Sequence, residues 1–366
     1  MRSTAINTVL LGGFMASSIV YTATKAAPLS IQGLIMFALM LVFIGWNASR
    51  GVKFSTSDAL VVLGSIFYFL GYLLFTDARL ENIALYLSSI IFFVILQKAR
   101  VDGRKIAVAL IVFWLLSIIL HPIELIDSFT ATRVDDYFSG FFDNSNTFAA
   151  YSTVVFSSTF IFVENRRVRW FIAVVFFVML FAHHSRNTLL FVLLSFIFYF
   201  LFTKGKGRLV PWLFFTIIAE ALLFLIVIEP NLVATDFVLF GKEANTAGRS
   251  EQVLSVVSHF DIKWFGVGAD TITKHSIGIN DYAVHNAWIN TLYSMGIIYF
   301  VLYAVFIRKV YMNIPPLARS FLLGFHVYSF FEPGLFFSIL MISSFPIIIT
   351  LLTLKDAKYE HSPLYL

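Results

Sequence analysis

A series of long apolar runs, separated by short segments that carry most of the charge, constrains this chain most strongly. A helix needs about 17–25 predominantly apolar residues to cross the hydrocarbon layer of a membrane. By that rule the sequence predicts an all-α polytopic membrane protein with about twelve spanning helices. They fall near residues 6–24, 30–47, 57–75, 81–97, 105–120, 146–163, 170–182, 188–203, 210–229, 285–307, 317–331 and 335–354.

The composition agrees with lipid as the main solvent. Charged residues make up 13% of the chain, against about 25% in a typical soluble domain. The 43 phenylalanines suit a lipid-facing surface, and the absence of cysteine excludes disulfides and thiolate metal sites. The basic residues punctuate the apolar runs instead of clustering on one face, which argues against a nucleic-acid partner.

The distribution of positive charge predicts the orientation. If the N-terminus is cytoplasmic, the inner connections hold 18 of the 26 Lys and Arg residues. That excess is what the positive-inside rule requires, so we expect both termini in the cytoplasm. The first apolar segment also resembles a signal peptide. We favour an uncleaved helix there, because a polytopic protein rarely needs a removable leader.

We expect one transmembrane domain over residues 1–366, with long outer loops at 121–145 and 230–284. Loops of this length are usually functional or disordered. The longer loop contains "RSEQVLSVVSHF", which predicts an amphipathic helix on the membrane surface or over a cavity. Its expected apolar face consists of Val253, Val256, Val257 and Phe260.

A histidine stands where the chain re-enters the membrane after the longer loop. His285 is expected in the first turn of its helix, with Asn280 or Asp281 as the N-cap. The positive end of the helix dipole should keep the imidazole neutral, so it can accept a proton as a general base. Asn286 could hold a hydroxyl or an amide beside it. The alternative is an interfacial histidine that only anchors the helix.

Two arginines on the outer side are candidates for binding an anion. Arg186, in "FAHHSRNTLLF", follows a short helix and is therefore expected below the outer membrane surface. Arg249 begins the amphipathic helix, where backbone N–H groups also attract anions. Together the two guanidinium groups would clamp a diphosphate. Alternatively, Arg186 snorkels to the membrane surface or forms a salt bridge with a carboxylate such as Glu332. The alternative for Arg249 is a solvated loop arginine.

Several further polar residues lie near these candidates. Asn144 and Asn146 stand where the first long loop becomes a helix, and capping is their expected role. Glu332, in "SFFEPG", sits at the outer turn of the last hairpin, and His184 lies in the same turn as "SRN". Glu220 lies near the middle of an apolar segment. An acid there is a functional candidate by default, the alternative being a protonated packing residue.

The outer loops lack the motifs of several site classes. They contain no D-x-D triad and no His and Asp cluster with metal-ligand spacing, and the chain has no phosphate-binding loop or dinucleotide fingerprint. We therefore expect a site without metal or cofactor. Arginines would then neutralise an anionic leaving group.

The order of these motifs resembles a known family. The run is N-x-N entering a helix, S-R-N-T-L-L, G-R, W-F-G-V-G, and H-N opening a helix that continues "MGIIYF". Over about residues 140–335 the chain resembles the O-antigen ligase and O-antigen polymerase superfamily of bacterial inner membranes. The resemblance implies a twelve-helix, metal-free GT-C-type glycosyltransferase with its site in the periplasm. Its donor would be an oligosaccharide on undecaprenyl diphosphate.

The resemblance also implies roles for single residues. Arg186 and Arg249 match the family's arginines and would bind the diphosphate. His285 matches its histidine and would activate the acceptor. Glu332 occupies a place similar to an acidic residue of the ligases. The expected chemistry inverts the anomeric carbon.

The acceptor distinguishes the two members of the superfamily. A polymerase extends another lipid-linked repeat unit, whereas a ligase transfers the glycan to lipid A-core. The short, Phe-rich chain with a modest outer loop favours a polymerase, for which a chain-length regulator would be a further partner besides the membrane lipids. The alternative from another class is a lipid-linked oligosaccharide flippase. That class predicts charged or broken helices near the midplane and paired halves, and only Glu220 is central here.

Overall fold

The computed structural model describes residues 2–23, 31–76, 79–131, 137–142, 144–223, 238–239, 242–243, 249–280, 284–332, 336 and 344–355. This part of the chain is helical apart from one antiparallel pair of two-residue strands, β1 (Val238–Leu239) and β2 (Lys242–Glu243). The helices are α1 (Arg2–Ala23), α2 (Ile31–Ala48), α3 (Thr56–Phe75), α4 (Leu80–Leu96), α5 (Gly103–Ile119), α6 (Pro122–Ser128), α7 (Ser145–Phe162), α8 (Arg166–Ala182), α9 (Arg186–Thr203), α10 (Val210–Leu223), α11 (Arg249–His259), α12 (Ala269–Asn280), α13 (Ala287–Asn313), α14 (Pro316–Tyr328) and α15 (Phe345–Leu352), with short 3₁₀ turns at Gly207–Leu209 and Thr353–Lys355.

Each apolar segment predicted from the sequence overlaps one of these helices, although parts of the segments 210–229 and 335–354 lie outside the described residues. Among the described residues, five helices (α1, α2, α3, α9 and α13) are long and apolar enough to cross a membrane, or six if the bent pair α5 and α6 forms one span. The prediction of a helical polytopic membrane protein is therefore confirmed in this coarser form. The helix α8 begins at Arg166, four residues before the predicted segment 170–182, so it is longer than the apolar run suggested.

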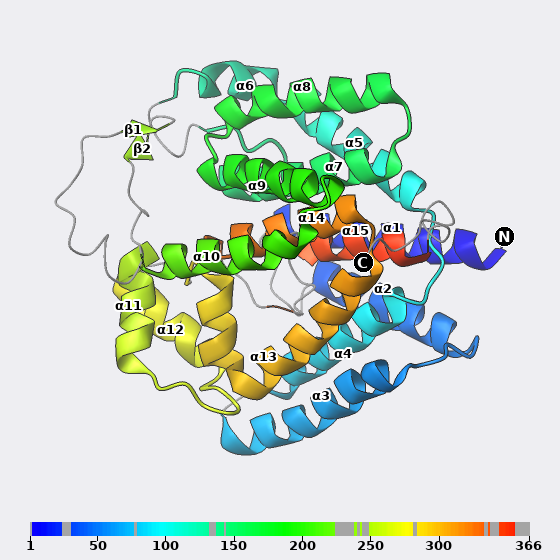
Figure 1. The fold of residues 1–366 in the computed structure, drawn as a ribbon, viewed down its shortest axis with the longest axis vertical. Helices are drawn as coiled ribbons and strands as arrows, with labels where there is room; N and C mark the ends of the chain where they lie inside the picture. The colour runs from blue at the N-terminus through cyan, green and yellow to red at the C-terminus, as the bar shows by residue number, and fades with distance from the viewer. Residues whose placement is uncertain are drawn as a thin grey trace.

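The helices pack as a bundle in which α8 lies along one edge, α3 along the opposite edge, and α1 and α15 between them (Figure 1). The most extensive helix pairs are α1 with α2 and α9 with α14, followed by α5 with α7 and α3 with α13. The N-terminus lies at one end of the bundle, and α11, α12 and the two strands lie at the other (Figure 1).

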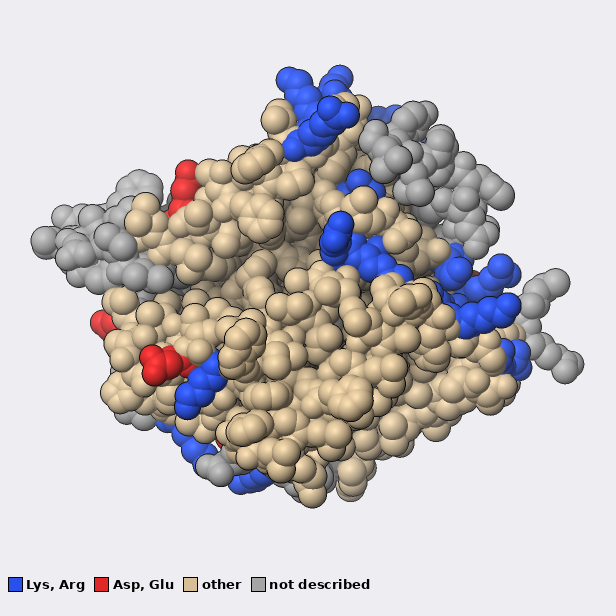
Figure 2. Space-filling view, turned by 60° about the horizontal axis from the view of Figure 1, so that its bottom comes forward, with Lys and Arg blue, Asp and Glu red and all other residues tan. Residues whose placement is uncertain are grey.

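Large apolar side chains cover much of the outer surface. Phe67 is 72% exposed, Leu74 is 78% exposed and Trp212 is 76% exposed. Soluble proteins rarely expose contiguous apolar surface of this extent, so these faces are suited to lipid. On the face shown in Figure 2, acidic side chains lie toward the end of the bundle opposite to the N-terminus, whereas basic side chains lie at both ends and along one edge.

A buried ion-pair cluster joins α3 and α13 to the segment after α4. The carboxylate of Asp58 is 1% exposed and contacts Lys309 Nζ, while Lys98 Nζ lies 2.9 Å from Asp58 Oδ2. Ser55 caps α3 in a reciprocal capping box, in which its hydroxyl oxygen accepts from Asp58 N and the Asp58 carboxylate accepts from Ser55 N. Because an unpaired buried charge is costly, this cluster fixes how the three segments meet.

The amphipathic helix predicted in the long outer loop is present as α11. Val253 and Val256 are fully buried and pack with Ile272 of α12 and Tyr293 of α13. A second helix, α12, follows α11 over Ala269–Asn280, where no helix was predicted from the sequence. The two helices form a cap over the start of α13 at the end of the bundle opposite to the N-terminus (Figure 1).

Candidate functional site

The three candidate residues with the clearest predicted chemistry all stand at the starts of helices. Arg186 is the first residue of α9, Arg249 is the first residue of α11, and His285 precedes the first residue of α13 by two positions. Backbone N–H groups at helix starts are unpaired within the helix and attract anions. The chain thus places its candidates where the backbone adds positive potential.

A sharp turn between α8 and α9 presents Arg186. His183 Nδ1 accepts a hydrogen bond from the Ser185 backbone N–H at 3.2 Å. His184 has a φ of 49°, an unusual conformation for a residue with a side chain, and its Nε2 lies 3.1 Å from Ser128 O. Ser185 then caps α9 with its side chain. These contacts fix the position of the Arg186 backbone, and the predicted supporting residue His184 is part of the turn itself.

Tyr137 covers this turn from the first long loop. Its ring stacks on the His184 ring with centroids 4.2 Å apart, and Phe138 N donates to Ala182 O at 3.1 Å. Burial raises the pKa of Tyr137, and the positive charge of Arg186 acts in the opposite direction. Tyr137 therefore lies within electrostatic reach of Arg186. No local pattern in the sequence had marked it.

The residue after Arg186 contacts the predicted acidic residue. Asn187 Nδ2 donates to Glu332 Oε1 at 2.6 Å and lies 3.4 Å from Phe331 O. Glu332 is buried, with 7% of its surface exposed. The structure thereby brings Glu332 to the start of α9, as its place at the outer turn suggested. Asn187 was not among the predicted site residues, although it follows Arg186 in "SRNTLL".

The start of α13 differs from the prediction. The N-cap is Asn286, whose Oδ1 accepts from Ile289 N at 2.9 Å, and not Asn280 or Asp281. Asn280 instead ends α12, and Asp281 lies outside the described residues. His285 therefore lies before the cap, and its expected place in the first helical turn was wrong. It remains next to the positive end of the helix.

The side-chain amide nitrogen of Asn286 can donate hydrogen bonds beyond those that the described residues accept. The side chain is fully buried and uses its oxygen for the cap. Its Nδ2 has no hydrogen-bond partner among the residues that the structure describes. A buried donor without a partner costs free energy, which a bound ligand can recover. The predicted role of Asn286 beside His285 is thus compatible with its function as a cap.

Two further hydrogen bonds join the helix starts. Ala287 N donates to Ser329 O at 3.0 Å, three residues before Glu332. His285 N donates to Gln252 Oε1 at 3.1 Å, and Gln252 lies one turn after Arg249. Gln252 is 4% exposed, although it lies outside the apolar face predicted for this helix. The start of α13 therefore touches both α14 and the first turn of α11. The side chain of Arg249 lies outside what the structure describes.

The remaining candidates are Asn144, Asn146 and Glu220. Asn144 caps α7 by accepting from Thr147 N at 2.8 Å, as predicted, and Asn146 lies half-buried in the first turn of that helix. Glu220 is exposed in the last turn of α10 and is not a buried packing residue. The described residues contain no group of three or more His, Asp or Glu side chains placed to hold a metal ion.

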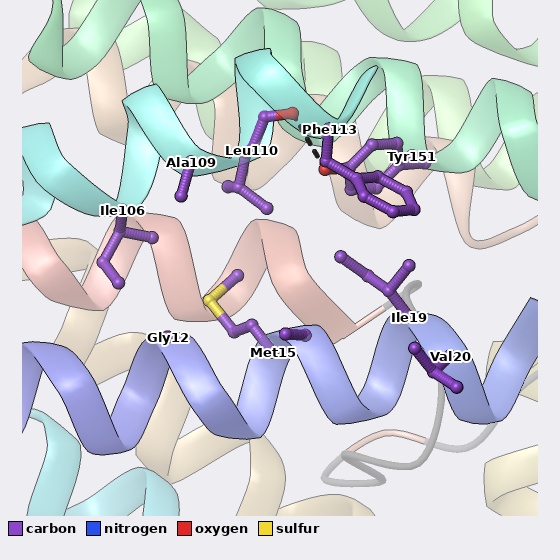
Figure 3. A pocket seen from close by; sticks show the side chains of 10 residues that line it. Gly12, Met15, Ile19, Val20, Ile106, Ala109, Leu110, Phe113 and Tyr151 are labelled. Carbon is purple, nitrogen blue, oxygen red and sulfur yellow. Dashed lines mark hydrogen bonds between the residues drawn. The ribbon is translucent and has the colours of Figure 1, made fainter. Parts of the chain in front are cut away.

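An apolar cavity of about 250 Å³ lies between α1 and α5, away from these polar residues (Figure 3). Met15 and Ile19 of α1 face Leu110 and Phe113 of α5 across it (Figure 3). The hydroxyl group of Tyr151 at its wall donates to Leu110 O at 2.9 Å. The cavity offers no charged group and is lined for contact with hydrocarbon.

Residues 171–304, about a third of the chain, match the model of the family described as O-antigen ligase. This match supports a relationship to the O-antigen ligase and polymerase superfamily. The O-antigen ligase match spans α8 to the middle of α13, and it includes Arg186, Arg249 and His285. The resemblance read from the motifs is therefore confirmed. Comparisons with curated proteins and with solved structures give no match.

The match to the O-antigen ligase family supports an enzyme of lipid-linked glycan transfer. The family implies a lipid-linked glycan and lipid A-core as substrates. The apolar helices and the family together indicate a membrane protein.

Proposed function

We propose that the protein is a metal-independent, inverting glycosyltransferase that polymerises oligosaccharide repeat units carried on undecaprenyl diphosphate. It would lie in the bacterial inner membrane as a twelve-helix GT-C-type protein, with both termini in the cytoplasm and the site facing the periplasm. The acceptor would be a second lipid-linked glycan. The product would be O-antigen or another surface polysaccharide.

One observation supports this proposal above the others. The starts of α9, α11 and α13 are connected through the bonds of Asn187 to Glu332, Ala287 to Ser329 and His285 to Gln252. Two arginines and a histidine thus stand at neighbouring helix starts, where N–H groups favour a diphosphate. Guanidinium groups add bidentate hydrogen bonds to phosphate oxygens.

The transfer step requires a base, a nucleophile and a stabilised leaving group. His285 would accept the proton of the acceptor hydroxyl as its oxygen bonds to the anomeric carbon. The bond from that carbon to the diphosphate oxygen breaks on the opposite face, which inverts the configuration. Arg186 and Arg249 would stabilise the charge that develops on the departing diphosphate. The free donor of Asn286 would hold an oxygen of the acceptor sugar.

The lipid part of the donor would remain in the hydrocarbon layer. The outer faces of α8 and α10 carry exposed apolar side chains, including Phe181, Trp212 and Phe215. The polyprenyl tail would lie along this surface while the diphosphate reaches the start of α9. The enzyme would then need no enclosed tunnel for the tail.

The second candidate is the ligase reaction, which uses the same donor chemistry with lipid A-core as acceptor. The description of the matched family favours it. A flippase is less well supported. Unwound helices in transporters leave backbone groups free for substrate or ions, whereas the break in α13 at Gly296 is filled by backbone groups of residues 263–268.

Gel analysis of surface glycan from a deletion strain tests the proposal. Loss of a polymerase leaves single repeat units attached to the lipid A-core. Loss of a ligase leaves the core bare and long chains on the carrier lipid. Unchanged surface glycan in the deletion strain would contradict both reactions. Restoration by the wild-type chain, but not by His285→Ala, would connect the phenotype to the site.

A further inference from the structure

The long helix α13 is broken at Gly296. This residue has a φ of 83° and a ψ of 179°, so the helix divides into a first segment (residues 287–295) and a second segment (residues 297–313). Glycine adopts a positive φ without the steric cost that a side chain imposes. The break frees backbone groups in the protein interior that need new partners.

The loop of residues 263–268, here called the clamp, supplies those partners. Two of its N–H groups donate to carbonyls that end the first segment, and two of its carbonyls accept from N–H groups that begin the second. The bonds are Val267 N to Tyr293 O at 3.0 Å, Gly268 N to Ser294 O at 3.0 Å, Ile297 N to Lys263 O at 3.1 Å and Ile298 N to Trp264 O at 3.2 Å.

The clamp and the break approach so closely that glycine is required on both sides. A Cβ atom on Gly296 would lie 2.3 Å from Gly266 N and 2.5 Å from Trp264 O. A Cβ atom on Gly266, which has a φ of 72°, would lie 2.2 Å from Ser294 O. Backbone atoms cannot move aside as the end of a side chain can. Either substitution must therefore separate the clamp from α13.

The helix α3 also contacts the junction between the clamp and the break in α13, here called the joint. Tyr68 OH donates to Met295 O at 2.5 Å, and Tyr72 OH accepts from Ala269 N at 3.2 Å. Phe265 of the clamp lies over Gly71, where a Cβ atom would be 2.2 Å from its ring. The joint thus holds α3, the clamp and both segments of α13 in one arrangement.

We propose that the clamp is a positioning element, with Gly266 and Gly296 as positioning residues for the proposed transfer reaction, on which this inference rests. The first segment of α13 carries Asn286 and His285 at its start. The clamp follows α11 in the chain and leads directly into α12. The joint therefore positions both residues of the hydrogen bond between His285 N and Gln252 Oε1, because it connects the clamp after α11 to the first segment of α13.

The consequence for catalysis follows from geometry. A displacement of about 1 Å between reacting groups can reduce a rate by about 10²-fold. Donor binding would be affected in part, because Arg249 stands on α11, which the clamp follows in the chain. Arg186 stands on α9, outside the hydrogen bonds given above for the clamp, and would still hold the diphosphate. Loosening the clamp should therefore lower kcat more than it raises KM for the donor. A merely structural role would lower the yield of folded protein and leave kcat per folded molecule unchanged.

Three variants separate these roles. Gly296→Ala disrupts the joint, and Tyr68→Phe removes one hydroxyl group while keeping the packing. The matched control is Gly64→Ala on α3, whose Cβ would meet only the side-chain end of Leu302 on the second segment of α13, at 2.9 Å. With a synthetic polyprenyl-diphosphate oligosaccharide as donor, we expect kcat to fall about tenfold or more in Gly296→Ala and about threefold in Tyr68→Phe. KM should stay within about threefold, and Gly64→Ala should match the wild type.

A distance measurement tests the joint without relying on activity. The chain has no cysteine, so nitroxide labels can be placed through Ser258→Cys on α11 and Leu74→Cys at the end of α3, both exposed. The distance between the labels should shift or broaden in Gly296→Ala and stay unchanged in Gly64→Ala.

The two readouts together decide the proposal. A changed distance with a lower kcat supports it. An unchanged distance, or an unchanged kcat per folded molecule, overturns it. If the wild-type protein transfers no glycan, the proposed function fails, and the label distances still decide whether the clamp positions the cap of α11 and α12.

Discussion

Asn187 and Glu332, 145 residues apart in the sequence, meet in a hydrogen bond of 2.6 Å between Asn187 Nδ2 and Glu332 Oε1. The bond joins the first turn of α9 to the segment after α14. It holds a buried carboxylate next to the position of Arg186. Residues from distant parts of the chain thereby come together at one end of the bundle.

We expect Asn187→Leu to destabilise the protein, because the substitution removes a donor to a buried carboxylate. The expected loss is about 1–3 kcal/mol in the free energy of unfolding, seen as a lower Tm in detergent. The control is Asn313→Leu, whose exposed amide bonds Lys309 O at 2.7 Å and should cost about 0.5 kcal/mol or less. Equal Tm values for the two variants would contradict a stabilising role for the Asn187 contact.

The buried cluster at the other end of the bundle should affect stability and not catalysis. Asp58→Asn removes the charge that pairs with Lys98 and Lys309 and should cost about 3 kcal/mol. The control is Asp102→Asn, whose carboxylate is 35% exposed where it pairs with Lys105. Asparagine still caps a helix, so this control should change stability by about 0.5 kcal/mol or less.

Thermal unfolding in detergent, combined with transfer activity per folded molecule, distinguishes the two aspartate variants. Asp58→Asn should unfold at a clearly lower temperature while its remaining folded fraction keeps wild-type activity. A loss of specific activity in Asp58→Asn would show that this cluster is coupled to the site.

Arg186 and Arg249 should bind the diphosphate of the donor through bidentate hydrogen bonds, and not only through their positive charge. We expect Arg186→Ala and Arg249→Ala each to lower kcat/KM for a polyprenyl-diphosphate donor by about 10²-fold. Arg186→Lys should recover only part of this loss, because an ammonium group cannot form the bidentate contact. The control is Arg79→Ala, which removes an exposed arginine whose Nε lies 3.9 Å from Asp270 Oδ2.

Inhibition by inorganic diphosphate provides the matching measurement. It should compete with the donor in the wild type and in Arg79→Ala, and it should inhibit Arg186→Ala and Arg249→Ala much more weakly. Equal inhibition constants in all four proteins would remove the arginines from the proposed diphosphate site.

Much of the helical framework could be predicted because the signals are local. The longest apolar runs correspond to α1, α2, α3, α9 and α13, and the spacing of Val253 and Val256 identified the buried face of α11. The order of the S-R, G-R and H-N motifs identified the superfamily before any contact was known. Each run or motif lies within a few neighbouring turns of chain, and the order of the motifs is read directly from the sequence.

The contacts that build the site could not be predicted because they join distant residues. Gly266 and Gly296 lie where the clamp and α13 approach so closely that neither position has room for a Cβ atom. In the sequence alone, each is an ordinary glycine of a loop or a helix. Gln252 looked like a surface residue of an amphipathic helix, and its inward position depends on the His285 N–H. The start of α13 was misplaced because Asn286 competes with earlier residues as the cap, and the packing around Ala287 and Ser329 decides between them.

The most direct test of the account is glycan transfer by the purified protein, with a synthetic polyprenyl-diphosphate oligosaccharide as donor and EDTA in the buffer. The comparison includes wild type, His285→Ala and the control His259→Ala, which changes an exposed histidine of the cap. We expect wild type and His259→Ala to transfer the glycan at similar rates and His285→Ala to be slower by about 10²-fold or more. Wild-type transfer rates in His285→Ala, or complete loss of transfer in EDTA, would contradict it.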